Sequence, residues 1–230
     1  MSYPIPADFG CQNSLISDEW RKYVLTTHNK LRRNLAIGQV KTANSAKTAP
    51  MAFNMNELRW DCDVEKYASA AMCSATALSG YYTITQTFKN AKGCNVTEET
   101  SKLLKEWWNE SNAVDLVDEN VQYTDEVKQK AQKFAFVSHN NLLREDLCVA
   151  VHTQMAYALV RGFACTYGTC AGSTGLKLYC VYRRKELAKD EKIYNPTKSL
   201  DKVCTQCASK LPPDERCIDR LCQQEYTSRE

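Results

Sequence analysis

The most prominent candidate for chemistry in this chain is a histidine in an apolar stretch. The chain has three histidines in 230 residues. One of them, His152, stands within Cys148–Tyr157 and directly precedes a Thr-Gln pair. An imidazole can bind a metal or act as a general base near neutral pH, so this stretch is the first candidate site. The competing interpretation is a packed or hydrogen-bonded core histidine that performs no chemistry.

The other two histidines are weaker candidates. His28 lies in a segment with helical periodicity and has no second ligand one turn further on, so a structural role is expected. His139 precedes two asparagines, where we expect an exposed helix start. A serine or cysteine nucleophile would need a histidine and an acid beside it, and the sequence contains no convincing set of this kind.

Cysteine content predicts the compartment. The twelve cysteines are an even number and many for 230 residues, and disulfides persist in oxidising surroundings. We therefore expect a mature secreted chain with its signal peptide removed. Cys204-x2-Cys207 and Cys217-x4-Cys222 are also compatible with zinc, and the pairing of the cysteines is left open. The predicted disulfide cysteines are Cys11, Cys62, Cys73, Cys94, Cys148, Cys165, Cys170, Cys180, Cys204, Cys207, Cys217 and Cys222.

Charge and hydropathy exclude two classes of partner. No apolar run approaches the roughly 18 residues that a membrane span needs, so no transmembrane segment is predicted. The 30 basic and 27 acidic residues give a net charge of +3. The one tight basic cluster, residues 183–185, would neutralise only about three phosphates. We therefore predict no nucleic-acid binding.

Apolar periodicity and capping residues predict the elements that would position these side chains. Ser17 is expected to cap a helix that ends near Gly38. Residues 79–95 are expected to form a long loop, and residues 186–230 a disulfide-stapled tail without its own core. The other predicted elements are a helix after Trp60 that ends before Ser79, a helix at about residues 97–112, a helix through Cys148–Tyr157, and strands at 162–167 and 176–182 that form a hairpin.

Five motifs in one order give the chain a family resemblance. They are His28-Asn29 with Arg32, Met55-Asn56 with Leu58 and Trp60, Trp107-Trp108-Asn109-Glu110, Thr153-Gln154-Met155-Ala156, and Leu178-Tyr179-Cys180-Val181-Tyr182. The chain resembles the CAP superfamily, and within it the venom allergen-like, or activation-associated secreted, proteins of nematodes. The resemblance implies an α/β fold, a three-layer α-β-α sandwich (CAP fold) with an antiparallel sheet. It divides the chain into a CAP (SCP/TAPS) domain, residues 1–185, and a cysteine-rich C-terminal extension, residues 186–230.

The resemblance also implies a central cleft with two histidines and two glutamates, which binds zinc in some members. Glu110 matches one glutamate. Leu78 occupies the position of the first histidine, and residues 80–88 contain no acid for the other glutamate. Val151 stands at the second histidine position, and His152 follows it, rotated by about 100° on a helix. We therefore predict a degenerate tetrad, with no catalytic residues, no metal and no cofactor. The alternative is a zinc-dependent hydrolase.

The resemblance further implies a secreted, non-enzymatic protein that binds sterols or fatty acids and acts on host immunity. Sterol binding in the family is associated with a flexible aromatic loop, here Tyr81, Tyr82, Ile84 and Phe88; the alternative is that these side chains cover the sheet. A third hypothesis is contact with a host immune-cell receptor through the cysteine-rich tail, by a monomer or weak homodimer.

Two glycosylation sequons also occur, at Asn95 and Asn109. Asn95 is expected in a loop, which suits a glycan, and Asn109 on the polar face of a helix. Both are predicted glycosylation sites, with Asn95 the better acceptor.

Overall fold

A computed structural model of the chain describes most of its residues. The described ranges are 5–44, 46–74, 80–88, 95–116, 121–131, 133–135, 155–184 and 187–226. The helices are α1 (Asp18–Ala36), α2 (Cys62–Ala71), α3 (Val96–Asn109) and α4 (Asp125–Lys130), with 3-10 turns η1 (Glu110–Ala113) and η2 (Leu200–Lys202). The strands are β1 (Met51–Ala52), β2 (Arg59–Trp60), β3 (Tyr82–Thr87), β4 (Gly162–Thr169), β5 (Leu176–Tyr182), β6 (Pro196–Thr197), β7 (Cys217–Ile218) and β8 (Leu221–Cys222).

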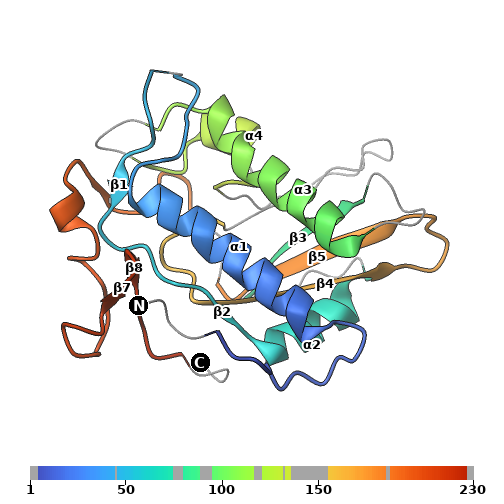
Figure 1. The fold of residues 1–230 in the computed structure, drawn as a ribbon. Helices are drawn as coiled ribbons and strands as arrows, with labels where there is room; N and C mark the ends of the chain where they lie inside the picture. The colour runs from blue at the N-terminus through green and yellow to red at the C-terminus, as the bar shows by residue number, and fades with distance from the viewer. Residues whose placement is uncertain are drawn as a thin grey trace.

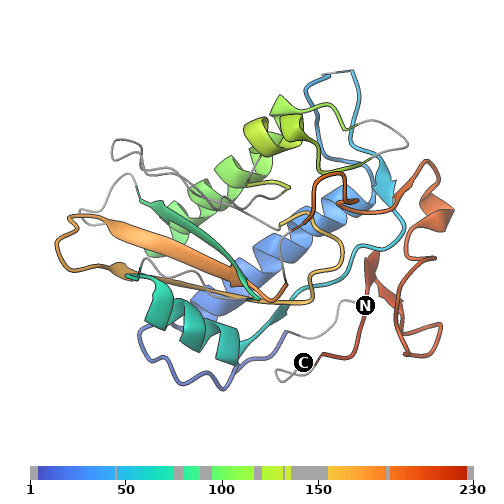
Figure 2. The same ribbon diagram turned by 180° about the vertical axis from the view of Figure 1, so that it is seen from behind.

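A four-stranded sheet in the order β2-β4-β5-β3 forms the middle layer. Helices α1 and α3 lie on one face and α2 on the other (Figures 1 and 2). Side chains alternate along β4: Phe163 and Cys165 join the core under α1 and α3, and Ala164 packs with α2. This confirms the three-layer sandwich. The β3–β5 and β4–β5 pairs are antiparallel, and the short β2 adds a parallel pair with β4.

Local sequence signals explain where the helices begin and end. The Ser17 hydroxyl accepts a hydrogen bond from the Trp20 amide at 3.2 Å, as expected for an N-cap. Gly38 follows α1 with φ +72°, which glycine adopts without strain. Asp61 caps α2 and Asn95 caps α3, each accepting from two backbone amides. The helices predicted at these positions are therefore present.

The predicted loop over residues 79–95 is wrong for its described middle part. Tyr82–Thr87 form the edge strand β3, which pairs with β5 over its whole length. Tyr82 and Ile84 point inward and are buried, and the half-buried Thr83 and Thr85 alternate with them. The high content of threonine and tyrosine suits a half-buried strand.

The helix predicted through Cys148–Tyr157 is wrong for its last three residues; residues 148–154 lie outside the described residues. Met155–Tyr157 are not helical. The Arg32 guanidinium donates to the carbonyls of Met155 and Tyr157 at 2.8 and 2.9 Å. These carbonyls therefore bind a side chain rather than helical amides.

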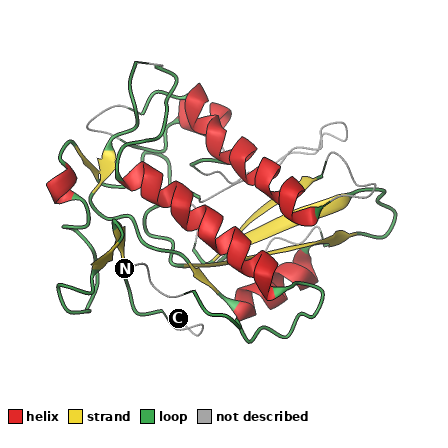
Figure 3. Ribbon diagram, in the orientation of Figure 1, coloured by secondary structure: helices red, strands yellow, loops and turns green. Residues whose placement is uncertain are grey.

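The tail, residues 187–226, packs against the rest of the chain (Figure 3). Ile193, Tyr194 and Leu221 are buried in the same core as α1 and the sheet. Strand β6 pairs with β1, and the Tyr194 hydroxyl donates to the Pro50 carbonyl at 2.8 Å. The tail thus shares the main core, and the division at residue 185 stays a prediction.

Ten of the predicted disulfide cysteines are paired. The disulfides are Cys11–Cys62, Cys73–Cys170, Cys165–Cys180, Cys204–Cys217 and Cys207–Cys222. Cys94 and Cys148 lie outside the described residues. Among the helices of the described ranges, none combines the length and the apolarity required to cross a bilayer.

Candidate functional site

Glu110 is the tetrad position that the sequence keeps, and Lys133 holds its carboxylate. Glu110 follows α3 directly, where Trp107 and Trp108 anchor the helix end in the core. Lys133 Nζ lies 2.9 Å from Glu110 Oε1, and the Lys133 backbone N–H donates to Oε2. Burial raises the pKa of Glu110, and the hydrogen bond and charge of Lys133 partly oppose that rise. Both oxygens already have partners within the chain.

The remaining tetrad positions are not described. Leu78, Val151 and His152 lie outside the described residues, as does His139. The displacement of His152 from the ligand position therefore stays a prediction. Among the described residues, Glu110 is the one that matches a ligand of the family's tetrad. Both of its carboxylate oxygens contact Lys133. A cation at Glu110 would compete with Lys133 for the carboxylate, and the absence of a metal site stays a prediction.

His28 is a packed core histidine, as the sequence predicts. The ring is fully buried on α1 and lies 4.4 Å from the Phe163 ring. Nδ1 donates to the Val24 carbonyl at 2.9 Å, and the Tyr182 hydroxyl donates to Nε2 at 2.8 Å. Burial lowers the pKa of His28 to about 4, and the charge of Arg32 adds to this effect. Both ring nitrogens are used, so His28 has no free atom for a ligand.

The side chains of the predicted lipid-binding loop cover the sheet. Tyr82, Ile84 and Phe88 are 6%, 1% and 3% exposed, and all three belong to the main core. Tyr81 packs against Tyr67 with ring centroids 5.4 Å apart. The expectation of exposed rings on a flexible loop is wrong, because strand β3 takes up this segment. Lipid contact by these residues stays a prediction.

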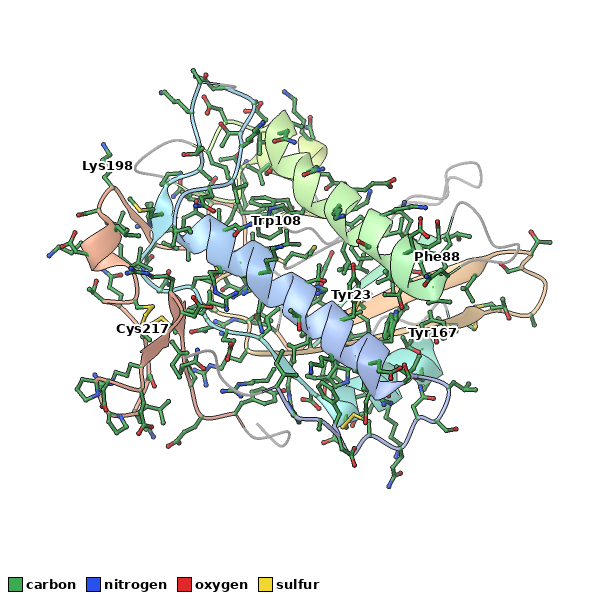
Figure 4. All side chains as sticks on the ribbon, viewed as in Figure 1. Tyr23, Phe88, Trp108, Tyr167, Lys198 and Cys217 are labelled. Atoms are coloured by element: carbon green, nitrogen blue, oxygen red, sulfur yellow. A yellow bond between two sulfur atoms is a disulfide. The ribbon has the colours of Figure 1, made fainter. Side chains whose placement is uncertain are left out.

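A groove of about 660 Å³ opens elsewhere, between the N-terminal arm (residues 5–9), α1 and β2 on one side and the tail on the other. The apolar side chains that line it come from all of these segments: Ile5, Phe9, Leu25, Leu58, Trp60, Leu211 and Ile218. Of the described residues at the groove, none comes from α3, η1 or α4. Figure 4 shows Trp108 on the α3 side of α1 and Cys217 in the tail. The groove is therefore a different site from Glu110.

The polar wall of the groove carries acidic side chains. The Glu57 side chain is 11% exposed, and Arg59 Nη2 lies 3.8 Å from its Oε2. Burial raises the pKa of Glu57, while Arg59 and Arg33 oppose the rise. Glu215 and Glu225 are exposed and also line the groove. The lining thus contains three carboxylates and one guanidinium.

The cysteines of the tail do not provide a metal centre. The sulfurs of Cys204, Cys207 and Cys222 lie within 4.8 Å of one another. All three are oxidised, since Cys204 bonds Cys217 and Cys207 bonds Cys222. Zinc binds thiolate sulfur, so these atoms are not available as ligands. The described residues include no other group of three that meets the same geometric requirement.

Comparisons with known proteins agree with the fold. No family model matches the chain. The Ancylostoma secreted protein of Ancylostoma caninum is 26% identical over 224 residues, which cover 95% of this chain and 46% of that protein. The chain thus spans about half the length of this curated relative. The crystal structure of Na-ASP-1 matches with a TM-score of 0.70 at 21% identity, over 96% of this chain and 49% of that one. The structure of NaASP2 with Zn2+ matches with a TM-score of 0.68 at 20% identity, over 93% of this chain and 100% of that one.

The helices on both faces of the sheet and the likeness to these structures define the CAP fold. The chain is thus similar in sequence to a secreted nematode protein and similar in fold to Na-ASP-1, NaASP2 and BmVAL-1. This confirms the resemblance drawn from the five sequence motifs.

Sequence reasoning missed both Lys133 and the groove. Lys133 lies 23 positions after Glu110 in a polar segment, and no spacing rule connects the two. The groove combines residues 5–9 with residues 211–226, the two ends of the described chain. The apolar residues of the tail, among them Ile193, Tyr194 and Leu221, were the available signal that the tail packs on the main core.

Proposed function

We propose that this protein is a secreted binding protein without enzymatic activity, which takes up a sterol or a fatty acid and acts on host immunity. The observation that carries the proposal is the 660 Å³ groove with apolar walls. Pockets for small ligands commonly measure about 300 to 1,000 Å³, with largely apolar walls and few polar groups. The groove has this size and lining.

The state of Glu110 supports binding rather than catalysis. A hydrolytic zinc site needs about three protein ligands and an open position for water. The Glu110 carboxylate is held by Lys133 at 2.9 Å, and the sequence has Leu78 and Val151 where the family has histidines. The proposal therefore assigns no catalytic step to the cleft.

Secretion is supported by the five disulfides of the described residues, since such bonds persist in oxidising compartments. Glycosylation at Asn95 fits the same proposal. Asn95 is exposed, and its Oδ1 caps α3, so the cap bonds do not involve Nδ2, the atom that a glycan modifies. Asn109 is also exposed, at the end of α3. Host immune-cell receptors are the proposed partners in immunity.

Titration with a fluorescent sterol, dehydroergosterol, tests the proposal on the full oxidised chain. We expect saturable binding that is unchanged by a metal chelator and by Glu110→Gln. Far-UV circular dichroism confirms that the variant is folded. Absence of saturable binding by wild-type protein, for both the sterol and a fluorescent fatty acid, would refute the proposed function. Loss of binding on chelation would instead point to a metal-dependent cleft.

A further inference from the structure

The groove between arm and tail has an apolar floor that fits the body of an amphiphile. Leu58 is 1% exposed over the whole residue, and the Trp60 indole is fixed because its Nε1 donates to Glu65 Oε2 at 2.7 Å. Leu25 extends this floor from α1. A rigid, preformed apolar surface binds without a large ordering cost, so the floor favours a rigid hydrocarbon body.

The charges of the groove disfavour an anionic head group. Glu57, Glu215 and Glu225 line it with Arg59 as the one lining cation among the described residues. The neighbouring Arg33 is paired with Asp219 at 2.7 Å and adds no net charge. Like charges brought together in a partly desolvated site repel strongly. A fatty carboxylate or a sulfate would meet this repulsion, whereas an uncharged head group would not.

The same wall gives an uncharged hydroxyl an acceptor. The Glu57 carboxylate is almost buried, with Arg59 3.8 Å away, too long for a close ion pair. Gln223 contributes a side-chain hydrogen bond to it. A carboxylate can accept several hydrogen bonds, so a ligand O–H has a place to donate. A protonated amine would approach Arg59 as well as Glu57 and would lose its own hydration.

We propose that this groove selects an amphiphile with an uncharged hydroxyl head group, a sterol alcohol rather than a fatty acid, and that Glu57 accepts the hydrogen bond of the hydroxyl. The inference rests on the proposed lipid-binding function and narrows it to one site and one head-group class. The tail forms one wall, and its Tyr226 closes against Gly162, where any side chain would collide with the tyrosine ring.

The tail wall is fixed by several bonds, so the site exists only in the complete oxidised chain. The Tyr226 hydroxyl bonds to Asp61, which also pairs with Arg183 at 2.9 Å. Two disulfides hold β7 and its neighbours. Tests therefore use all 230 residues of the chain with the disulfides intact.

Matched ligands test the head group. Cholesterol and cholesterol sulfate share one ring system, and 1-hexadecanol, palmitate and hexadecylamine share one chain. Each competes against dehydroergosterol at neutral pH. We expect cholesterol to bind at least about tenfold more tightly than its sulfate, and hexadecanol more tightly than palmitate or hexadecylamine. In Glu57→Gln the difference between alcohol and anion should shrink to about threefold or less, since one lining charge is gone.

Substitutions in the tail test the location. Leu211→Trp should fill the groove and weaken cholesterol binding by about tenfold or more. Ile218→Trp is the second blocking variant, in case the first does not fold. Leu200→Trp is the matched control: Leu200 is 47% exposed in the same tail and does not line the groove. It should bind cholesterol as wild type does.

The outcomes separate the inference from the proposed function. If wild-type protein binds no lipid, both fall. If it binds cholesterol but neither folded blocking variant weakens binding, the site lies elsewhere and the inference alone is overturned. Equal or tighter binding of sulfate, palmitate or hexadecylamine overturns the head-group assignment and leaves lipid binding intact.

Discussion

Two carboxylates, Glu65 beneath the groove and Glu110 beside the predicted cleft, meet cations in different ways. The Glu65 side chain is 1% exposed, and Arg21 binds both of its oxygens, through Nε at 2.8 Å and Nη2 at 2.7 Å. Trp60 donates a third hydrogen bond. The Glu110 side chain is 21% exposed and has the flexible Lys133 as its ion-pair partner. A fully buried carboxylate needs a partner for each of its oxygens, whereas a partly exposed carboxylate can also be solvated by water.

This difference separates structural from functional interpretations of a charged residue. The region around α1 contains Glu65, His28 and Arg32, all of residue types that catalyse reactions elsewhere. In each case the polar atoms already have partners within the fold: Glu65 bonds to α1, His28 to β5 and to its own helix, and Arg32 to the segment before β4. These bonds connect layers of the sandwich. We therefore assign this region to stability, and the predictions for Glu65 and His28 concern unfolding rather than catalysis.

Replacing Glu65 should have the largest effect. In Glu65→Gln the buried Arg21 loses its bidentate partner and keeps Asp18, whose side chain is 33% exposed. Removing one member of a buried pair costs about 3 to 5 kcal/mol. Urea unfolding of the oxidised protein should show this loss. Glu98→Gln, which breaks an exposed pair with Lys102, is the control and should change the unfolding midpoint little. A small effect at Glu65 would show that Asp18 alone can support Arg21.

Acid should weaken the region around α1 through His28. Its pKa in the folded protein is about 4 against 6.5 for an unperturbed histidine, so the unfolded chain takes up the proton first as pH falls. The contribution of neutral His28 to the unfolding free energy is fully present above pH 6.5 and is lost between pH 6.5 and pH 4. The expected loss of unfolding free energy is up to about 3 kcal/mol.

Urea unfolding at several pH values within this window, compared between wild type and His28→Gln, measures this contribution. Acidic groups contribute to both proteins, so the difference between their slopes isolates the histidine. Equal slopes would mean that His28 is protonated in the folded protein despite its burial.

Much of the α1 region could be predicted from sequence, and the rest of the molecule less well. Ser17, Gly38 and the apolar spacing of α1 are local signals, and they predicted the helix correctly. Strand β3 carries a local signal, since Tyr82 and Ile84 alternate with threonines, but the loop prediction for residues 79–95 did not use it. At Met155–Tyr157, which are not helical, two carbonyls accept hydrogen bonds from Arg32, more than 120 positions away. No local pattern contains that information.

The candidate sites show the same limit. Glu110 was predicted from a motif, because its neighbours Trp107 and Trp108 are adjacent in sequence. Its partner Lys133 and the acidic wall around Glu57 depend on tertiary packing. The assignment of Leu78 and Val151 to the histidine positions stays a prediction, and the sequence did not predict the groove that the fold creates.

Replacing Glu110 should have the smallest effect, and its pH dependence should oppose that of His28. Burial raises the pKa of Glu110, so the folded chain binds this proton more tightly than the unfolded chain does. The ionised carboxylate therefore lowers stability above its folded pKa, and this cost disappears as pH falls toward the unperturbed value of 4.5. In Glu110→Gln the unfolding free energy at neutral pH should change by no more than about 1 kcal/mol.

Lys133→Met is the companion variant, and it should be more harmful than Glu110→Gln, because it leaves a half-buried carboxylate without its cation. On acidification, the unfolding free energy of wild type should rise relative to that of Glu110→Gln. Relative to His28→Gln, the unfolding free energy of wild type should fall. If Glu110→Gln instead lowers the unfolding free energy as much as Glu65→Gln does, the partly buried pair of Glu110 and Lys133 is as important for stability as the fully buried one. The carboxylate beside the cleft would then belong with the structural network of α1.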